Sequence, residues 1–197
     1  MARFEAVHKA DARRVMLSHA LRWTWAHDNT QPALCPRTGL WQHPYQGANL
    51  DAKIGCAMSH FLLWNRCVEA GEPILILEHD AVFIREFPFF EFRGICQIND
   101  PRGATRSGDW WSDVMQARAG CGVFPKTVVF ESRRPDGLAG NSAYVVQPAA
   151  ALQLIEAYRE LGVWPNDATM CRQLFPCLEE YFPFITRVEQ MQSTSSQ

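Results

Sequence analysis

The stretch Pro73-Ile74-Leu75-Ile76-Leu77-Glu78-His79-Asp80 carries most of the information about the fold, because an apolar run ends abruptly in polar groups. Four consecutive branched apolar residues after a proline predict a short strand buried on both faces. In open α/β sheets, ligands bind in the crevice beyond the carboxyl ends of the strands. Carboxylates there, one residue apart, can hold a hard divalent cation, and the cation can hold a diphosphate. A solvated turn is the alternative explanation.

The composition is that of an ordinary globular protein. The chain has 197 residues, of which 47% are hydrophobic and 20% charged, enough for one domain with a substantial core. Its formal net charge of −2 creates no overall field that favours nucleic acid or an anionic membrane. Basic residues nevertheless gather in one third of the chain, and a local patch there stays open as an alternative: Arg102, Arg106, Arg118, Lys126, Arg133 and Arg134.

The seven cysteines and the chain's hydropathy favour the cytoplasm. None of the cysteines has CxxC spacing, which is typical neither of a disulfide framework nor of a zinc site. Cys56 and Cys67 lie in an apolar helical stretch and are expected in the core. We see no signal peptide and no run approaching the ~20 apolar residues that a membrane span needs. We therefore expect a protein of the reducing cytoplasm, with no membrane span.

Strands and helices alternate along the chain, which predicts an α/β domain with a mainly parallel sheet flanked by helices. Helices are expected over 11–28, 52–70, 148–161 and from Asn166 to Phe175; strands over 73–77, 81–84, 127–131, 142–147 and 184–188. The pair of strands between 127 and 147 is expected to be antiparallel. Residues 29–49 read as a long loop.

Three segments in this order resemble glycosyltransferase family 25, which includes lipopolysaccharide-biosynthesis galactosyltransferases and the collagen galactosyltransferase domain. The first two are the helix that opens Ile54-Gly55-Cys56-Ala57-Met58-Ser59-His60 and the strand that ends Leu77-Glu78-His79-Asp80. The third comprises the strand Asn141-Ser142-Ala143-Tyr144-Val145-Val146 and the turn Pro165-Asn166-Asp167. The resemblance covers about residues 50–190.

The resemblance implies a GT-A-like (Rossmann-like) fold, with residues 1–190 as a single domain and 191–197 as a flexible tail. It implies inverting transfer of a sugar from a nucleotide sugar, usually a UDP-sugar, to a hydroxyl acceptor such as a glycan. It also implies a divalent cation, Mn2+ most often, with Mg2+ as the alternative. A compact, phage-borne variant acting in a bacterium or an infected host fits this description.

Two departures from the family pattern stand out. The family's Glu-Asp-Asp motif is Glu78-His79-Asp80 here, so the middle carboxylate is missing. Phe4-Glu5-Ala6-Val7 resembles the segment that follows the family's first βα unit, so that unit is expected to be absent or supplied differently. Its absence leaves an open sheet edge through which the chain can form an oligomer.

Each candidate site residue receives a role from this comparison and from its chemistry. Asp80 and Glu78 are the expected metal ligands, and Asp167 is the expected base that takes the proton of the acceptor hydroxyl. Asp80 is also counted as catalytic, because a cation neutralises charge on the leaving nucleotide. The remaining expected donor-binding residues are Gly55, Ser59, His60, His79, Asn141 and Ser142, with Glu78 as an alternative ligand of the donor ribose.

Simpler explanations stay open for several of these residues. His60 in an apolar helix is typical of a hydrogen-bonded core histidine, and Asp167 of a helix N-cap. At the level of function, one alternative is a non-catalytic nucleotide-sugar-binding protein with a decayed GT-A fold. The other is a glycosyltransferase that acts on modified viral DNA, which the net charge does not favour.

Overall fold

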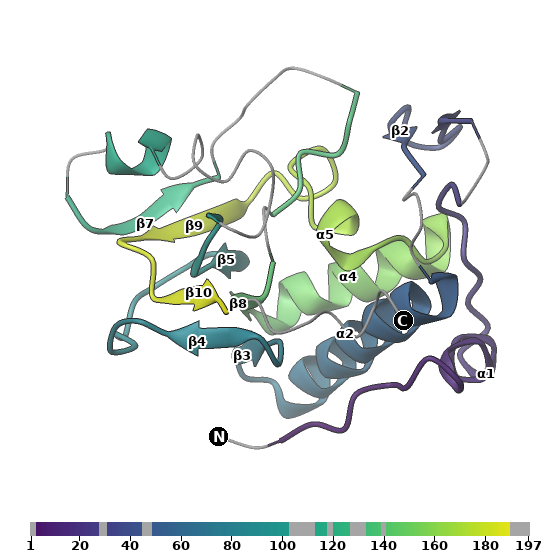
Figure 1. The fold of residues 1–197 in the computed structure, drawn as a ribbon, viewed down its shortest axis with the longest axis horizontal. Helices are drawn as coiled ribbons and strands as arrows, with labels where there is room; N and C mark the ends of the chain where they lie inside the picture. Colours follow the sequence, from purple (N-terminus) through teal and green to yellow (C-terminus); the bar gives the residue numbers. More distant parts are fainter. Residues whose placement is uncertain are drawn as a thin grey trace.

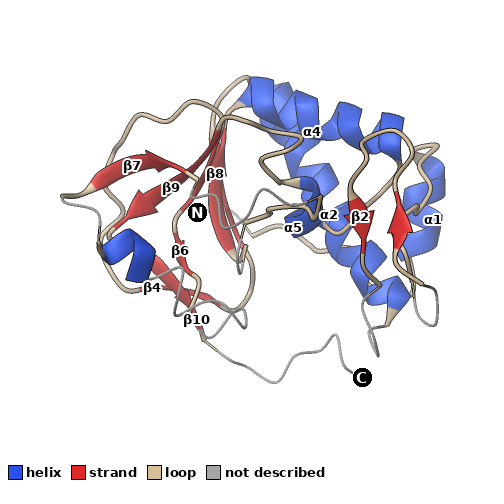
Figure 2. Cartoon of the chain, turned by 90° about the horizontal axis from the view of Figure 1, so that it is seen from above, coloured by secondary structure: helices blue, strands red, loops and turns tan. Residues whose placement is uncertain are grey.

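The structure is a computed structural model that describes residues 3–27, 31–44, 49–102, 113–117, 120–126, 133–138 and 141–189. It is an α/β fold in which a five-stranded sheet packs against a layer of helices (Figure 1). Figure 2 shows α1, α2, α4 and α5 gathered on one side of the main sheet. The helices are α1 (Ala12–Ser18), α2 (Leu50–Ala70), α4 (Pro148–Leu161) and α5 (Asn166–Thr169).

The main sheet has the strand order β3-β8-β5-β9-β7. Its members are β3 (Ile74–Leu77), β5 (Ile95–Gln97), β7 (Gly122–Pro125), β8 (Ala143–Val146) and β9 (Leu178–Phe182). Only β5 and β9 run parallel, whereas β8 is antiparallel to both β3 and β5, and β7 is antiparallel to β9. The expectation of an α/β sheet is confirmed, but the expectation of a mainly parallel sheet is wrong: the sheet is mixed.

Two smaller sheets complete the strand structure. The first joins β4 (Ala81–Phe83), β10 (Thr186–Val188) and β6 (Asn99–Asp100), with β10 in the middle. The second is the hairpin of β1 (Ala33–Leu34) and β2 (Trp41–Gln42), which lies within the stretch predicted as a loop. β4 follows β3 after a short turn but belongs to a different sheet, so the chain changes sheet at the Glu78–Asp80 turn.

β3 is less buried than its sequence predicts. It lies at the edge of the sheet, and only Ile76 among its four residues is buried. The even-numbered Ile74 and Ile76 face the helix layer, while Leu75 and Leu77 pack against a small cluster around Ile98 and Ile185 on the other face. The strand that is buried on both faces is instead β8, which has a neighbour on each side.

Local sequence signals explain the bounds of the long helices. Asn49 caps α2, because its side-chain oxygen accepts a hydrogen bond from the backbone N of Ala52 at 3.1 Å. Gly71 ends α2 in the left-handed conformation, with φ of 68°. Pro148 opens α4, where a missing N–H costs nothing. α2 and α4 lie side by side across the sheet (Figure 1).

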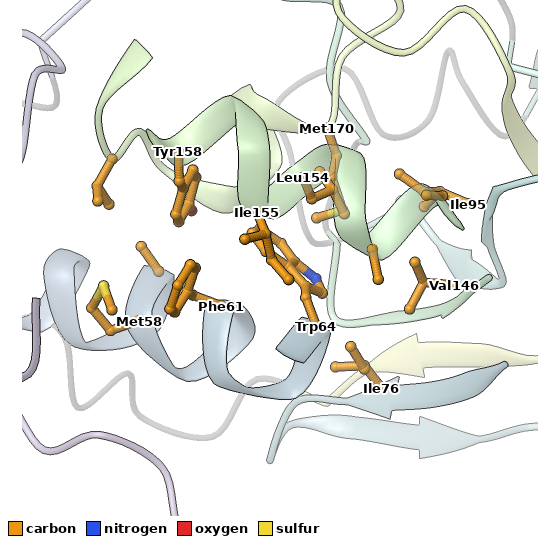
Figure 3. Close-up of a cluster of buried hydrophobic side chains, with 14 of the residues drawn as sticks. Met58, Phe61, Trp64, Ile76, Ile95, Val146, Leu154, Ile155, Tyr158 and Met170 are labelled. Carbon is orange, nitrogen blue, oxygen red and sulfur yellow. The ribbon is translucent and has the colours of Figure 1, made fainter. Parts of the chain in front are cut away.

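The main core lies between these two helices and the sheet (Figure 3). Trp64 of α2 and Tyr158 of α4 meet edge to face, with ring centroids 5.1 Å apart. Ile76, Ile95 and Val146 close the core from the sheet side. This packing fixes α2 against the end of β3, and it thereby places the polar residues of α2 next to those that follow β3.

The N-terminal residues and the segments that connect the main helices and strands differ most from the prediction. The helix expected over 11–28 ends at Ser18, because the backbone of Arg22 and Thr24 pairs with Val163. The helix expected from Asn166 to Phe175 ends at Thr169. Residues 3–8 form no strand, and within the described part of the chain β3 is the first strand to enter the main sheet. The strand predicted over 127–131 and the tail 191–197 lie outside the described residues.

Candidate functional site

The candidate site begins where β3 ends and the chain turns. The backbone N of Glu78 donates to the carbonyl of Ser142 at 2.7 Å, which is the last contact between β3 and the β8 segment. The backbone N of Ala81 then donates to the carbonyl of Glu78 at 3.2 Å and closes a turn. His79 is exposed in this turn, whereas Glu78 and Asp80 are half-buried. The strict alternation of a strand therefore stops at Glu78.

Glu78 points toward α2, as the even-numbered residues of β3 do. Its Oε1 lies 3.0 Å from Nε2 of His60 and 4.0 Å from Sγ of Cys56. Cys56 and His60 are one helical turn apart, so both project from the same face of α2. The thiol, the imidazole and the carboxylate form the one group of three such ligand atoms found within 4.8 Å of one another in the described part of the chain.

A line of hydrogen bonds orients His60 from behind. The indole N of Trp64 donates to the hydroxyl of Tyr144 at 2.8 Å, and this hydroxyl lies 2.8 Å from Nδ1 of His60. All three side chains are buried. In the neutral ring the hydroxyl proton of Tyr144 can point to Nδ1 while Nε2 donates to Glu78, and in the protonated ring Nδ1 donates to the Tyr144 oxygen instead. The ring is thus fixed at both nitrogens.

The surroundings of His60 shift its titration. Burial by itself lowers the pKa of His60, but Tyr144 and the hydrogen-bonding groups of Cys56 and Glu78 outweigh it, so the pKa lies well above its ordinary value of 6.5. His60 is the buried, hydrogen-bonded histidine that the sequence left open as the simpler explanation. It also holds the first carboxylate of the Glu-His-Asp motif in place.

Asp80 has an unsatisfied carboxylate oxygen. Its Oδ1 is buried and has no hydrogen-bond partner among the described residues. Burial raises the pKa of Asp80, the nearby Glu78 carboxylate raises it further, and His79 offsets part of this. A buried acceptor without a donor is costly in a folded protein, and a cation is one way to satisfy it.

Asn141 and Ser142 bring two more unpaired polar atoms to the same strand end. Both residues are buried immediately before β8, next to the turn that follows β3. Oδ1 of Asn141 and Oγ of Ser142 lack hydrogen-bond partners among the described residues. Buried polar groups of this kind need hydrogen-bond partners, and a polar ligand at the strand ends is one source of them.

The turn Pro165-Asn166-Asp167 also reaches this region. Oδ1 of Asn166 accepts from the thiol of Cys56 at 3.7 Å, so the start of α5 packs against the face of α2 that carries His60. Asp167 is half-buried beside it, and its Oδ1 accepts from the backbone N of Ala168 at 2.9 Å. The structure therefore brings the turn that carries Asp167, the predicted base, next to Cys56.

Gly55 and Ser59 face away from this cluster and hold the N-terminal segment. A Cβ on Gly55 would lie 2.7 Å from the carbonyl oxygen of Val7, so only glycine permits this approach. The Ser59 hydroxyl donates to the carbonyl of Gly55 at 2.7 Å and accepts from the backbone N of Val7 at 2.9 Å. Their contacts in the structure are structural, and their predicted donor-binding role stays a prediction.

Three residues of the cluster were not predicted to lie there. From the sequence, Cys56 is expected in the core, and Tyr144 and Asn166 are named only as members of the strand and the turn that resemble the family. A signal for Cys56 was present, because it precedes His60 by four residues and so shares its helix face. The contact between Asn166 and Cys56 depends on how α5 docks, which no local pattern encodes.

The fold and the site together define a class of protein. A mixed α/β sheet with helices on one side and carboxylates at the end of an apolar strand is consistent with a Rossmann-like glycosyltransferase fold. Residues 16–94 match the model of glycosyltransferase family 25 (LPS biosynthesis protein). The match confirms the resemblance over the segment that holds α2, β3 and the Glu78–Asp80 turn, and it supports a glycosyltransferase.

Asn141, Ser142 and Asp167 lie outside the matched segment. A search of curated proteins gave no significant match. In the part of the chain that the structure describes, none of the helices is both long and apolar enough to cross a membrane.

Proposed function

We propose that this glycosyltransferase moves a sugar from a nucleotide sugar of the UDP type to a hydroxyl group of a glycan. The transfer inverts the configuration of the sugar and uses a divalent cation. The observation that carries the proposal is the buried, unpaired Oδ1 of Asp80 in the turn after β3, within the segment that matches the family. The unpaired groups of Asn141 and Ser142 on the adjacent strand end support a polar ligand at the same place.

The residues present fit a hard cation. Asp80 offers an oxygen that no protein donor satisfies, and oxygen is the ligand that Mn2+ and Mg2+ prefer. Burial and the nearby Glu78 carboxylate both raise the pKa of Asp80, and a positive ion beside the two carboxylates offsets both effects. We therefore assign Asp80 as the first ligand and Glu78 as the second carboxylate of the site. A bound cation supplies positive charge that stabilises the departing nucleotide.

The proton of the acceptor hydroxyl requires a base. We assign this role to the carboxylate of Asp167, which is half-buried at the start of α5, beside the Cys56 and His60 face of α2. Asp167→Asn keeps the shape of the side chain but removes the base. We expect this variant to bind the donor like the wild type and to lose transfer by at least about a hundredfold.

The first experiment measures nucleotide release from UDP-, GDP- and CMP-sugars, with Mn2+ or with EDTA. We expect release or binding of one nucleotide class in the presence of metal, and its loss in Asp80→Asn. Asp11→Asn is the matched control, because the Asp11 side chain is 50% exposed and pairs with Arg14. If no donor in the panel shows either nucleotide release or metal-dependent binding, the proposal is contradicted.

One observation favours a second function. His79 replaces the middle carboxylate of the family motif and is exposed, so the site has one acidic ligand fewer than the family pattern. A non-catalytic nucleotide-sugar-binding protein would bind the donor with metal but transfer nothing to any acceptor. Binding without turnover across a panel of glycan acceptors, unchanged in Asp167→Asn, would favour this alternative.

Action on nucleic acid finds less support in the described residues. Lys126, one of the six basic residues of the candidate patch, is buried and pairs with Glu180 at 3.5 Å. Arg102 binds the carboxylate of Asp100. Arg106 and Arg118 lie outside the described residues. Binding to DNA that persists at physiological salt would revive this alternative.

A further inference from the structure

We propose that Cys56, His60 and Glu78 form a second metal site, which binds a zinc-type divalent ion with Asn166 as the fourth protein ligand. This site shares Glu78 with the oxygen site at Asp80, but its other ligands come from α2 and the start of α5, and they select a different metal. It does not depend on the proposed function, because binding can be measured without any substrate.

The spacing of the four ligand atoms fits such an ion. A tetrahedral zinc ion with bonds of about 2.0–2.3 Å separates neighbouring ligand atoms by roughly 3.5 Å. Nε2 of His60 and Oε1 of Glu78 are 3.0 Å apart, and Sγ of Cys56 lies 4.0 Å from Oε1 of Glu78. Oδ1 of Asn166 is 3.7 Å from the same sulfur. The ligand atoms of Cys56, His60 and Glu78 all lie within 4.8 Å of one another, and the contact with the sulfur makes Asn166 the candidate for the fourth position.

The chemistry of these ligands selects the metal. A thiolate and an imidazole favour Zn2+ and similar borderline ions over Mg2+ and Mn2+, which prefer oxygen. The Cys56 thiolate and the Glu78 carboxylate carry two negative charges, which balance a doubly charged ion when His60 is neutral. A neutral site of this kind is compatible with its partial burial, in which His60 is buried and the other two are half-buried.

The residues behind His60 already provide the support that metal-bound histidines usually have. A histidine that binds metal through one nitrogen typically hydrogen-bonds through the other. Nδ1 of His60 faces the hydroxyl of Tyr144 at 2.8 Å, and Trp64 fixes that hydroxyl from the other side. With metal on Nε2, the Nδ1–H donates to Tyr144, whose oxygen has lone pairs for both His60 and Trp64.

The ion would connect three separate elements. Cys56 and His60 belong to α2, Glu78 follows β3, and Asn166 opens α5. These elements carry the Asp80 turn and the Asp167 turn, so an ion here fixes the distance between them. A zinc site is not predicted from spacing alone, because CxxC spacing is absent and the four ligands come from three distant segments.

The test is metal binding by the purified protein. Chelator-stripped wild type is titrated with Zn2+ and with Co2+, which reports thiolate coordination by a sulfur-to-cobalt absorption band. We expect one equivalent per chain, a Kd below about 1 µM, the cobalt band, and a higher Tm with Zn2+. We expect Cys56→Ser and His60→Gln to lose at least about a hundredfold in affinity, and Tyr144→Phe about tenfold.

Two variants serve as controls and should keep the full affinity for zinc. Cys177→Ser and Cys121→Ser each remove an exposed cysteine that is not one of the proposed ligands. A measurement on the wild type alone guards against misfolded variants: zinc should protect Cys56 from alkylation while Cys177 still reacts. Absence of stoichiometric binding, absence of the cobalt band, or equal affinity in a folded Cys56→Ser variant would each overturn the proposal.

Discussion

At the scale of single residues, Asp80 combines an unsatisfied oxygen with a raised pKa, and both features make its charged form costly in the metal-free fold. Groups arranged for a ligand often destabilise the protein that carries them. Removing the charge of Asp80 should therefore help folding while it harms binding. These opposite effects separate a ligand-binding carboxylate from one that only supports the structure.

The first prediction concerns the stability of Asp80→Asn. The pKa of Asp80 is raised above 3.8 in the folded protein, so the folded protein binds a proton at Asp80 more tightly than the unfolded chain does. The stabilisation by this proton is present at low pH and is lost as pH rises through the folded pKa. At pH 7.5 without metal, we expect the variant to melt roughly 1–3 °C higher than the wild type. The difference should shrink toward pH 4, as thermal scans at both pH values can show. A difference in Tm of the same size at both pH values would show that the charge of Asp80 does not cause it.

The second prediction concerns His60, whose pKa is raised in the fold. A base with a raised pKa contributes stability in full below its unfolded pKa of 6.5, and this contribution is lost as pH rises through the folded pKa. Above pH 6.5 the wild type should therefore lose unfolding free energy faster than His60→Gln, by at most ~1.4 kcal/mol per pH unit. Urea titrations of metal-free protein at several pH values measure this slope, with the exposed His79→Gln as control. If the unfolding free energies of the wild type and His60→Gln change with pH at the same rate, titration of His60 does not contribute to stability.

At the scale of elements, the helices were the most predictable part of the fold. Asn49, Gly71 and Pro148 are strong local signals, and α2 and α4 begin and end within two residues of the predicted bounds. β3, β4, β8 and β10 were predicted from apolar runs. β5, β6 and β9 were not, because their stretches carry polar side chains, and β7 was not, because glycine and proline flank its two apolar residues. A strand as short as Asn99–Asp100 is defined by its partner rather than by its own pattern.

The direction of the strands could not be predicted from alternation alone. The prediction of a parallel sheet assumed that each strand returns through a helix. The long connection between β5 and β8 lets β8 enter between β3 and β5 in the opposite direction. Within the site, Glu78 and Asp80 were predicted from the strand end, but the turn after Leu77 directs Glu78 to His60. Loop paths and strand order are long-range properties that a local pattern does not contain.

The third prediction tests how α2 holds the N-terminal segment. In Gly55→Ala the new methyl group would lie 2.7 Å from the carbonyl of Val7, so backbone must move. We expect a loss of about 1–3 kcal/mol in unfolding free energy, measured by urea denaturation. Gly94→Ala is the matched control, because its methyl group would meet the Ala150 side chain at an ordinary 3.5 Å. Equal stability of the two variants would show that this contact does not constrain the helix.

At the scale of the whole molecule, one core connects the helix layer with the main sheet. Leu154 and Ile155 of α4 pack with Trp64 of α2 and with Ile95 and Val146 of the sheet (Figure 3). The site lies at one border of this core, where α2 meets the end of β3. Loosening the core should therefore affect the helix layer, the sheet and the site together, rather than one part alone.

The last prediction uses two leucines of α4 that differ only in where they lie. Leu154 is fully buried, whereas Leu152 is 41% exposed. We expect Leu154→Ala to cost about 2–5 kcal/mol and Leu152→Ala no more than about 0.5 kcal/mol. Because helices and sheet share the core, urea transitions followed by far-UV circular dichroism and by tryptophan fluorescence should coincide in both variants. Separate transitions in Leu154→Ala would mean that the sheet and the helix layer unfold independently. The site would then lie between two weakly coupled parts, and donor binding would fail before the protein unfolds.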